Sequence, residues 1–352
     1  MKAFEKNIRK VEPYVPGEQP QRKVIKLNTN ENPYPPAPGV TKALEEMDTD
    51  RFRLYPDPTA APLVNALADF YHVNPDQVFV GVGSDDVLSM CFLTFFNSEK
   101  PIFFPDITYS FYSVWADLYR IPYECQKLDE DFKLVKEDYY KENGGVIFPN
   151  PNAPTGIYED LSVVEDIIAH NQDVIVIVDE AYIDFAGCSA LELIDKYDNL
   201  IVVQTFSKAR SMAGMRIGYA ISNPTLIKYL NDAKYSFNSY TMNQTSIVCG
   251  VEAVKDKEYF ENGVRKIVET REWAKEELTK LGFTYLDSGS NFIFAKHPKY
   301  DAKELFEALK AHDIYVRFWG SERIEQYMRI TIGTREEMEQ LFAFLKEYMK
   351  NK

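Results

Sequence analysis

The residues with the clearest chemical potential lie in one stretch, Thr205-Phe206-Ser207-Lys208-Ala209-Arg210-Ser211-Met212-Ala213-Gly214-Met215-Arg216. Lys208 follows a run of apolar residues, so its stem would be partly desolvated and its ammonium would lie at the end of a buried strand. Both features favour a reactive amine. The small residues around Lys208 leave room for a planar ring to approach the backbone, and Arg216 offers a fork that matches a phosphate.

A second candidate, Asp179, ends the apolar run Val176-Ile177-Val178 and is followed by Glu180-Ala181-Tyr182. A carboxylate at this place could pair with a ring nitrogen, keep that nitrogen protonated and make the ring a strong electron sink. Asp179 could also simply cap a helix. The Asp-Glu-Ala-Tyr string, about thirty residues before the lysine stretch, favours the interpretation that includes a ring.

A glycine turn, Gly81-Val82-Gly83-Ser84-Asp85-Asp86, lies between an apolar run and a helical pattern. Glycines let the backbone close on an anion, and a helix N-terminus supplies free N–H groups for a phosphate. The complete GxGxxG dinucleotide fingerprint is absent, because position 86 is Asp. Tyr109, further along the chain, could stack on a ring or be an ordinary core or surface aromatic.

Histidine and cysteine do not suggest a metal site or a catalytic pair. Each of the four histidines lies more than four residues from any other histidine and from any cysteine. We therefore expect no metal, and proton transfer that does not use histidine. The four cysteines show no CxxC pair and are too few for a disulfide framework, which favours a reducing compartment.

The elements that must position these residues alternate between short apolar runs and amphipathic stretches. The runs are apolar at consecutive positions, which is typical of strands buried on both faces. We expect such strands at 78–82, 101–104, 145–148, 174–178, 200–205 and 217–221. Helical patterns between them, such as 85–96 and 161–170, indicate crossovers and a mostly parallel, doubly wound sheet of the α/β class.

The pattern changes after about residue 262. Helices are expected at 263–281, at 302–311 and at the end of the chain, with strands at 283–286, 291–295 and 327–332. The Pro-rich segment 32–38 should be a loop. The predicted division is an N-terminal arm (1–31) that belongs with the small domain, a large domain (32–261) and a small α+β domain (262–352).

Composition excludes several other classes. At 352 residues the chain can form a large core and a smaller domain, and 45% hydrophobic with 27% charged residues is ordinary for a globular protein. The net charge of −14 without a basic cluster argues against nucleic acid. No run approaches the ~20 apolar residues of a membrane span, and the first seven residues lack the apolar core of a signal peptide. We expect a cytoplasmic protein.

Taken in order and spacing, these motifs resemble the fold-type I enzymes that use pyridoxal 5′-phosphate (PLP). The lysine stretch matches the attachment pattern of class II aminotransferases. Three further segments resemble signatures of the histidinol-phosphate aminotransferase family, and the resemblance covers nearly the whole chain. These segments are Leu27-Asn28-Thr29-Asn30-Glu31-Asn32-Pro33, Arg53-Leu54-Tyr55-Pro56 and Met328-Arg329-Ile330-Thr331-Ile332-Gly333-Thr334.

The resemblance implies a role for each matching residue. Lys208 would be the Schiff-base lysine and proton carrier, Asp179 the partner of the pyridine nitrogen, and Tyr182 a donor to the ring hydroxyl oxygen. Tyr109 would stack on the ring. The cofactor phosphate would be held by Ser84, Asp85, Ser207, Arg216 and, from the other subunit of a homodimer, Tyr55. Arg329 would bind the carboxylate of glutamate, and the other amino donor would contact Tyr14, Asn28, Tyr240 and Arg317.

One position departs from the family pattern. Relatives commonly carry asparagine directly before Pro-Thr-Gly, where it bonds the ring hydroxyl oxygen, but here that residue is Ala153. Either Asn152 replaces it or Tyr182 acts alone.

The implied reaction is ping-pong transamination of L-histidinol phosphate with 2-oxoglutarate and glutamate, a step of histidine biosynthesis. The nearest alternatives are a threonine-phosphate decarboxylase and an aromatic aminotransferase of the same fold. A non-enzymatic PLP-binding regulatory module would normally carry a basic helix-turn-helix segment, which is not visible here. A dinucleotide-dependent reductase would leave the lysine stretch without a role.

Overall fold

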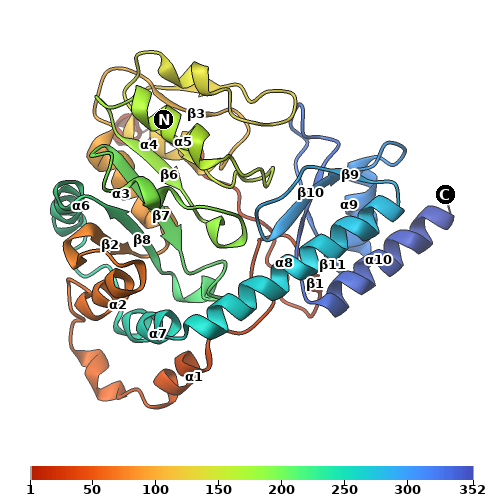
Figure 1. Cartoon of the computed structure of the whole chain (residues 1–352), viewed down its shortest axis with the longest axis horizontal. Helices are drawn as coiled ribbons and strands as arrows, with labels where there is room; N and C mark the ends of the chain where they lie inside the picture. The colour runs from red at the N-terminus through yellow and green to blue at the C-terminus, as the bar shows by residue number, and fades with distance from the viewer. Residues whose placement is uncertain (1, 352) are drawn as a thin grey trace.

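A seven-stranded sheet forms the centre of the large part of the chain in a computed structural model that describes residues 2–351 (Figure 1). The strand order is β2-β8-β7-β6-β5-β3-β4. The bounds are Val78–Gly81 (β2), Ile102–Pro105 (β3), Tyr123–Gln126 (β4), Val146–Pro149 (β5), Val176–Asp179 (β6), Leu200–Thr205 (β7) and Gly218–Ser222 (β8). Because β8 is antiparallel to both of its neighbours and the other adjacent pairs are parallel, the prediction of a mostly parallel sheet is confirmed.

The sequence predicted β2, β3, β5, β6, β7 and β8, and every residue of these six observed strands is buried, which explains their apolar runs. The missed strand β4 lies at the edge of the sheet, and its first three residues are exposed. Its sequence, Tyr-Glu-Cys-Gln, therefore carries no apolar run that could have predicted a strand.

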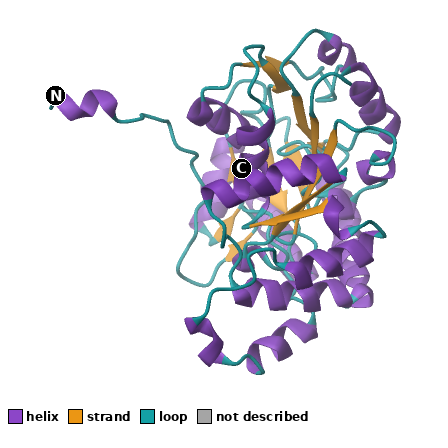
Figure 2. Cartoon of the chain, turned by 90° about the vertical axis from the view of Figure 1, so that its left-hand side faces the viewer, coloured by secondary structure: helices purple, strands orange, loops and turns teal. Residues whose placement is uncertain are grey.

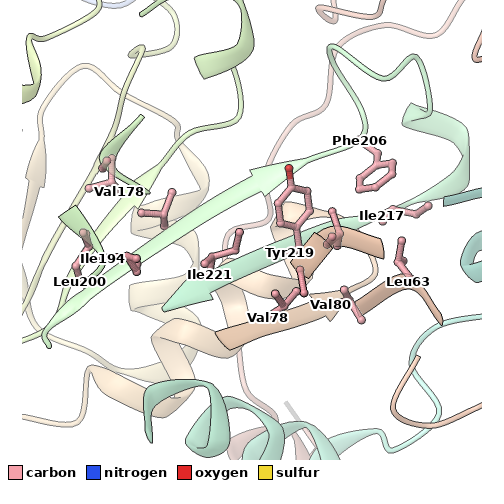
Figure 3. Close-up of a cluster of buried hydrophobic side chains, with 14 of the residues drawn as sticks. Leu63, Val78, Val80, Val178, Ile194, Leu200, Phe206, Ile217, Tyr219 and Ile221 are labelled. Atoms are coloured by element: carbon pink, nitrogen blue, oxygen red, sulfur yellow. The ribbon is translucent and has the colours of Figure 1, made fainter. Parts of the chain in front are cut away.

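Helices cover both faces of this sheet (Figure 1). Neighbouring residues of one strand enter opposite cores: Val78 and Val80 belong to one cluster and Phe79 to the other. Figure 3 shows the first cluster, in which Tyr219 and Ile221 of β8 lie beside β2. The helices of this part are Pro38–Glu45 (α1), Ala61–Tyr71 (α2), Ser84–Phe95 (α3), Phe111–Tyr119 (α4), Leu161–His170 (α5), Pro224–Phe237 (α6) and Gln244–Lys255 (α7).

A second, smaller unit is built on an antiparallel sheet in the order β12-β13-β10-β9 and on a parallel pair, β1 with β11. Its strands are Ile25–Lys26 (β1), Thr284–Tyr285 (β9), Phe292–Lys296 (β10), Ile314–Tyr315 (β11), Arg317–Phe318 (β12) and Met328–Thr331 (β13). Its helices are Lys257–Lys280 (α8), Ala302–Ala311 (α9) and Arg335–Lys350 (α10). The N-terminal arm contributes β1, which supports our proposal that the arm belongs with the small domain.

Two of the differences from the expected element boundaries have a clear local cause. Helix α8 begins at Lys257 rather than at 263, because the Asp256 side chain accepts a hydrogen bond from the Tyr259 amide (3.0 Å) and caps the helix. Figure 1 shows α8 running from α7 towards the small sheet, so one helix joins both parts. Pro38, expected in a loop, is the first residue of α1, where its missing N–H has no helical partner to lose.

Seven short 3-10 turns complete the described elements: Ala3–Asn7, Thr49–Arg53, Pro75–Gln77, Lys136–Tyr140, Ile183–Phe185, Ala190–Leu193 and Ala213–Met215. Figure 2 shows that the first of them projects away from the body of the chain on an extended segment. No helix within residues 2–351 is long and apolar enough to cross a membrane.

Candidate active site

Two cavities meet at Lys208. The inner cavity, about 170 Å³, lies at the carboxyl edge of the large sheet, and the outer cavity, about 670 Å³, opens between the large and small units. Both are bordered by Thr29, Tyr109, Tyr182 and Lys208. The inner cavity brings together eight of the predicted cofactor residues: Ser84, Asp85, Tyr109, Asp179, Tyr182, Ser207, Lys208 and Arg216.

The Lys208 loop leaves the carboxyl end of β7 and folds back on itself. The Met212 amide donates to the Phe206 carbonyl (3.0 Å), and the Phe206 amide donates to the Ile217 carbonyl (3.0 Å). These bonds fix the loop, so that the partly buried Lys208 Nζ lies 3.4 Å from the Thr29 carbonyl oxygen and 5.6 Å from the centre of the Tyr182 ring.

The wall made by the glycine turn depends on a close backbone contact. A Cβ atom at Gly218 would overlap the backbone of Gly83 and Ser84, so only glycine lets β8 lie against the start of α3. Arg216, in a left-handed conformation (φ 53°), reaches Asp85 with an N–O distance of 3.3 Å. The positive end of α3 and the Arg216 guanidinium therefore face the same corner, which suits an anion.

Asp179 is buried at the carboxyl end of β6. Its carboxylate accepts hydrogen bonds from the Tyr112 hydroxyl (2.8 Å) and from the Ala181 amide (3.2 Å). Burial raises the pKa of Asp179 to about 6, although both hydrogen bonds favour the charged form. A cationic partner in the inner cavity would relieve the desolvation of this carboxylate.

Burial, aided by Asp179, raises the pKa of Tyr112 well above its ordinary value. The Tyr112 hydroxyl therefore stays protonated at neutral pH and can donate to the Asp179 carboxylate.

Tyr182 has a partner that the sequence did not predict. The Asn30 amide nitrogen donates to the Tyr182 hydroxyl oxygen (2.8 Å), and the Asn30 side-chain oxygen accepts from the Thr331 hydroxyl (2.9 Å). One asparagine therefore connects the N-terminal arm, the segment after β6, and β13. Asn30 lies within a quoted motif, but only the fold could show where its amide points.

The structure does not bring Asn152 into either cavity. Its side-chain nitrogen donates to the Ile107 carbonyl (2.9 Å) and to the Thr155 hydroxyl (3.1 Å), and its oxygen accepts from Thr108 (3.0 Å). These bonds hold the loop, and Ala153 borders the cavities instead. The alternative in which Asn152 replaces the missing asparagine therefore has no support in this arrangement, because its polar atoms already have partners.

Tyr55 and Tyr240 also lie outside both cavities of their own chain. Their rings stack on each other at 4.5 Å, and their exposed fractions are 80% and 45%. A role for either tyrosine in this chain's own site has no support in this arrangement.

The outer cavity contains the remaining predicted residues, Tyr14, Asn28, Arg317 and Arg329. The Nη2 group of Arg329 donates to the Asn28 carbonyl (2.9 Å), and its buried Nε–H has no hydrogen-bond partner within the described chain. Its guanidinium lies 5.1 Å from the centre of the Trp319 ring and 5.2 Å from that of Phe292. The Nε–H of this guanidinium therefore lacks an acceptor, and a ligand carboxylate would supply one.

Arg317 borders the outer cavity at another point. Its Nη2 group donates to the Val15 carbonyl (3.2 Å), and its guanidinium lies 5.4 Å from the centre of the Trp319 ring. Tyr14 stacks on Phe111 with ring centres 4.2 Å apart, which places the middle of the N-terminal arm beside the same cavity. Two arginines at different points can hold two anionic groups of a substrate.

A segment of residues 319–324, here called the strap, covers part of the outer cavity. The Arg323 side chain pairs with Asp106 (2.8 Å) and donates to the Leu128 carbonyl (2.9 Å), both in the large unit. Ile324 packs in an apolar cluster with Leu128 and Phe132. The sequence of the strap shows neither a helical nor a strand-like hydrophobic pattern, so its role could not be predicted.

The fold and the inner cavity define a class of protein, and comparisons agree. Residues 22–345 match the family model "Aminotransferase class I and II", so the chain belongs to that family. The predictions of an aminotransferase and of its fold are thereby confirmed.

Within the family, the similar relatives share one name. The chain is 52% identical to a histidinol-phosphate aminotransferase of Lactococcus lactis subsp. cremoris (strain MG1363), with 99% of each chain covered. It is 50% identical to one of Brachyspira hyodysenteriae (strain ATCC 49526 / WA1), with both chains fully covered. A crystal structure of the Sinorhizobium meliloti enzyme in complex with pyridoxal-5′-phosphate has a TM-score of 0.84 at 25% identity, covering 94% of this chain and 92% of that one. The chain belongs with the histidinol-phosphate aminotransferases.

Proposed function

We propose that this protein transfers the amino group of L-histidinol phosphate to 2-oxoglutarate, with PLP as cofactor, in histidine biosynthesis. The observation that carries the proposal is the convergence of Lys208, Asp179 and Arg216 on one cavity in a chain about half identical to histidinol-phosphate aminotransferases over its whole length. The roles of individual residues given below are part of the proposal.

The inner cavity fits PLP. Its phosphate would be held by Ser84, Asp85, Ser207 and Arg216, where a helix N-terminus and a guanidinium meet. Asp179 would bind the ring nitrogen, and Tyr182 the ring hydroxyl oxygen. When bound, PLP supplies an electron sink that stabilises the charge left on the substrate when a proton is removed.

Proton transfer falls to Lys208. Lys208 borders both cavities, and its amine would take the proton from the α-carbon of the amino substrate and return it later in the cycle. The hydrogen bond from the Asn30 side chain fixes the position of the Tyr182 hydroxyl, which would donate to the ring hydroxyl oxygen. The strap and the Tyr14 segment would shield this proton transfer from water.

The two arginines of the outer cavity should discriminate between substrates. We expect Arg317→Ala to reduce kcat/KM for histidinol phosphate by about one to two decades, because each charged hydrogen bond is worth roughly 1.5–3 kcal/mol. Arg329→Ala should reduce kcat/KM for glutamate by a similar factor. Steady-state kinetics of each variant with both substrates measure the crossover.

A conservative pair serves as the control, since Arg317→Lys and Arg329→Lys keep the charge and lose the fork. Equal losses for both substrates in Arg317→Ala, or equal wild-type activity on histidinol and histidinol phosphate, would contradict the assignment. The second result would favour the aromatic aminotransferase, and release of carbon dioxide from threonine phosphate would favour the decarboxylase.

The proposed working unit is a homodimer. Large apolar and aromatic side chains are exposed on the single chain near positions 52–55 and 237–240, and Tyr55 stacks on Tyr240 across the two segments. These side chains are Phe52, Leu54, Tyr55, Phe237 and Tyr240, with exposed fractions between 45% and 80%. Apolar surface of this kind is typical of a protein interface. In a dimer, Tyr55 of each chain would reach the phosphate corner of the other.

Mixing two inactive variants tests this sharing. Tyr55→Ala and Lys208→Ala homodimers should each have little activity, and subunit exchange should restore up to about a quarter of the wild-type activity, because half of the chains form hybrids with one intact site. The recovered rate after mixing, with exchange followed by native mass spectrometry, measures it. Complete exchange without recovery would place Tyr55 outside the partner's site.

We also propose a cytoplasmic location. Four free cysteines, Cys91, Cys125, Cys188 and Cys249, support it, since unpaired thiols persist in a reducing compartment.

A further inference from the structure

A third cavity, about 360 Å³, lies on the other side of the Lys208 loop. It is bordered by the linker before α1, by the loop residues Ala209 to Ser211, and by the first turns of α8. None of its lining residues takes part in the function proposed above.

The lining of this cavity is positively charged. Arg210 and Lys266 border it, and no aspartate or glutamate does, in a chain whose net charge is −14. Neither cation has a carboxylate within ion-pair distance among residues 2–351. The Lys266 Nζ instead lies 5.3 Å from the centre of the Tyr34 ring. An acidic protein that keeps two unpaired cations at one cavity can attract an anion there.

Arg210 supplies a second, independent observation. Its side chain is only 6% exposed and lies 4.2 Å from the centre of the Phe260 ring and 4.6 Å from that of Phe70. Nη1 donates to the Ala253 carbonyl (2.9 Å), and the guanidinium also interacts with the Tyr71 hydroxyl, but Nη2 makes no hydrogen bond of ordinary length within the described chain. A buried cation with an unused donor is costly, and an anionic acceptor would offset that cost.

The acid that interacts with Arg210 is Asp184. Burial raises the pKa of Asp184 to about 6, and Arg210 lowers it only in part. Asp184 lies beyond ion-pair distance and does not border the cavity. It therefore does not satisfy the free Nη2 group.

We propose that this cavity binds a phosphate group, either as inorganic phosphate or as a phosphate monoester. Arginine and lysine match a dianion, and the hydroxyls of Tyr34 and Ser211, which bond to no residue within 2–351, can donate to its oxygens. A free amino acid fits poorly, because its ammonium would find two cations and no carboxylate.

A bound phosphate would connect three segments of the chain: the linker before α1, the Lys208 loop and helix α8. The Asn32 amide nitrogen already donates to the carbonyls of Lys208 (3.1 Å) and Ala209 (3.2 Å), so the linker and the lysine loop are coupled. A ligand between Arg210 and Lys266 would add α8, the helix that runs to the small unit. The site would thereby tie the lysine loop to the position of the small unit.

Binding of inorganic phosphate to the holoenzyme tests the proposal without turnover. No amino substrate is added, PLP occupies the inner cavity, and the Arg317→Ala background removes the proposed phosphate contact of the outer cavity, so the remaining binding by equilibrium dialysis reports this site. We expect Lys266→Met and Tyr34→Phe each to weaken it about tenfold, and Lys266→Arg to retain most of it. Lys257→Met, an exposed lysine on the same helix, should leave it unchanged.

Two outcomes would overturn the proposal. In the first, no phosphate binds to the PLP-loaded enzyme in the Arg317→Ala background. In the second, phosphate binds equally well to Lys266→Met, Tyr34→Phe and Lys257→Met. Comparing dialysis of phosphate with that of glucose 6-phosphate distinguishes the free ion from an ester, since an ester that fits the cavity competes with labelled phosphate. Because no step depends on transamination, failure here leaves the proposed enzyme activity standing.

Discussion

Lys208→Ala is expected to abolish transamination. Loss of the proton carrier alone costs about two to four decades in rate, and the variant also loses the amine that borders both cavities. Single-turnover kinetics with a direct assay of amino transfer should measure no rate above the uncatalysed background. The visible absorbance expected for the purified wild type should be absent or displaced.

A labelling experiment locates the attachment independently of the rate. Borohydride treatment of the wild type should leave one modified lysine, Lys208, in the peptide map. Lys228→Ala, which removes an exposed lysine on α6 paired with Asp232, should behave as the wild type in both assays. Modification of another lysine, or substantial turnover by Lys208→Ala, would refute the central assignment.

Asp179→Asn should reduce kcat by about two decades while the fold persists. The amide keeps the size of the side chain but removes the charge that would hold the ring nitrogen in its protonated form, which is worth one or two charged hydrogen bonds. Tyr112→Phe is the matched control, because it removes the 2.8 Å hydrogen bond to Asp179 and leaves the carboxylate. Its loss of kcat should be much smaller. Equal losses in the two variants would indicate a structural role for Asp179.

The raised pKa of Asp179 predicts that PLP affinity depends on pH, and the same two variants test this. With a pKa raised by burial to about 6, Asp179 is mostly neutral below that pH and mostly charged above it. Because the charged form binds the protonated ring, PLP affinity should weaken as the pH falls through about 6 and be constant above it. Tyr112→Phe should move this midpoint upwards, since the Tyr112 bond favours the charged form. Asp179→Asn should lose the midpoint, which a spectroscopic titration of PLP at each pH can measure.

Much of the large sheet could be predicted because its strands are buried on both faces. The β7 prediction at 200–205 matches both ends, since the strand begins with four consecutive apolar residues and a loop rich in small residues follows it. Strand β4 could not be found in this way, because an edge strand needs no apolar pattern. The start of α8 was missed for a local reason: its first turns are polar, and a single capping aspartate decides where it begins.

The site divides along the same line. Side chains at or shortly after the end of a buried strand, such as Asp179 and Lys208, could be found because the carboxyl ends of parallel strands lie at one edge of the sheet. Asn30 and Tyr112 act on them through contacts between distant segments, and no local pattern encodes those contacts. Asn152 shows the reverse case. It lies next to the position where relatives carry the ring-binding asparagine, but its side-chain amide forms hydrogen bonds with Ile107 and Thr155 instead of reaching a cavity.

The pairing of the two ends of the chain also determines when the site can form during synthesis. The backbone N–H of Asn30 donates to the hydroxyl of Thr331 (3.0 Å), a residue 301 positions later in the chain, and β1 pairs with β11. Contacts of such long sequence separation form slowly, and on the ribosome they must wait for the last segments to emerge. The inner cavity is made mostly of residues before 217, whereas the outer cavity needs Arg317 and Arg329. A nascent chain therefore contains the residues that line the cofactor cavity before Arg317 and Arg329, the two proposed anion-binding residues, have emerged.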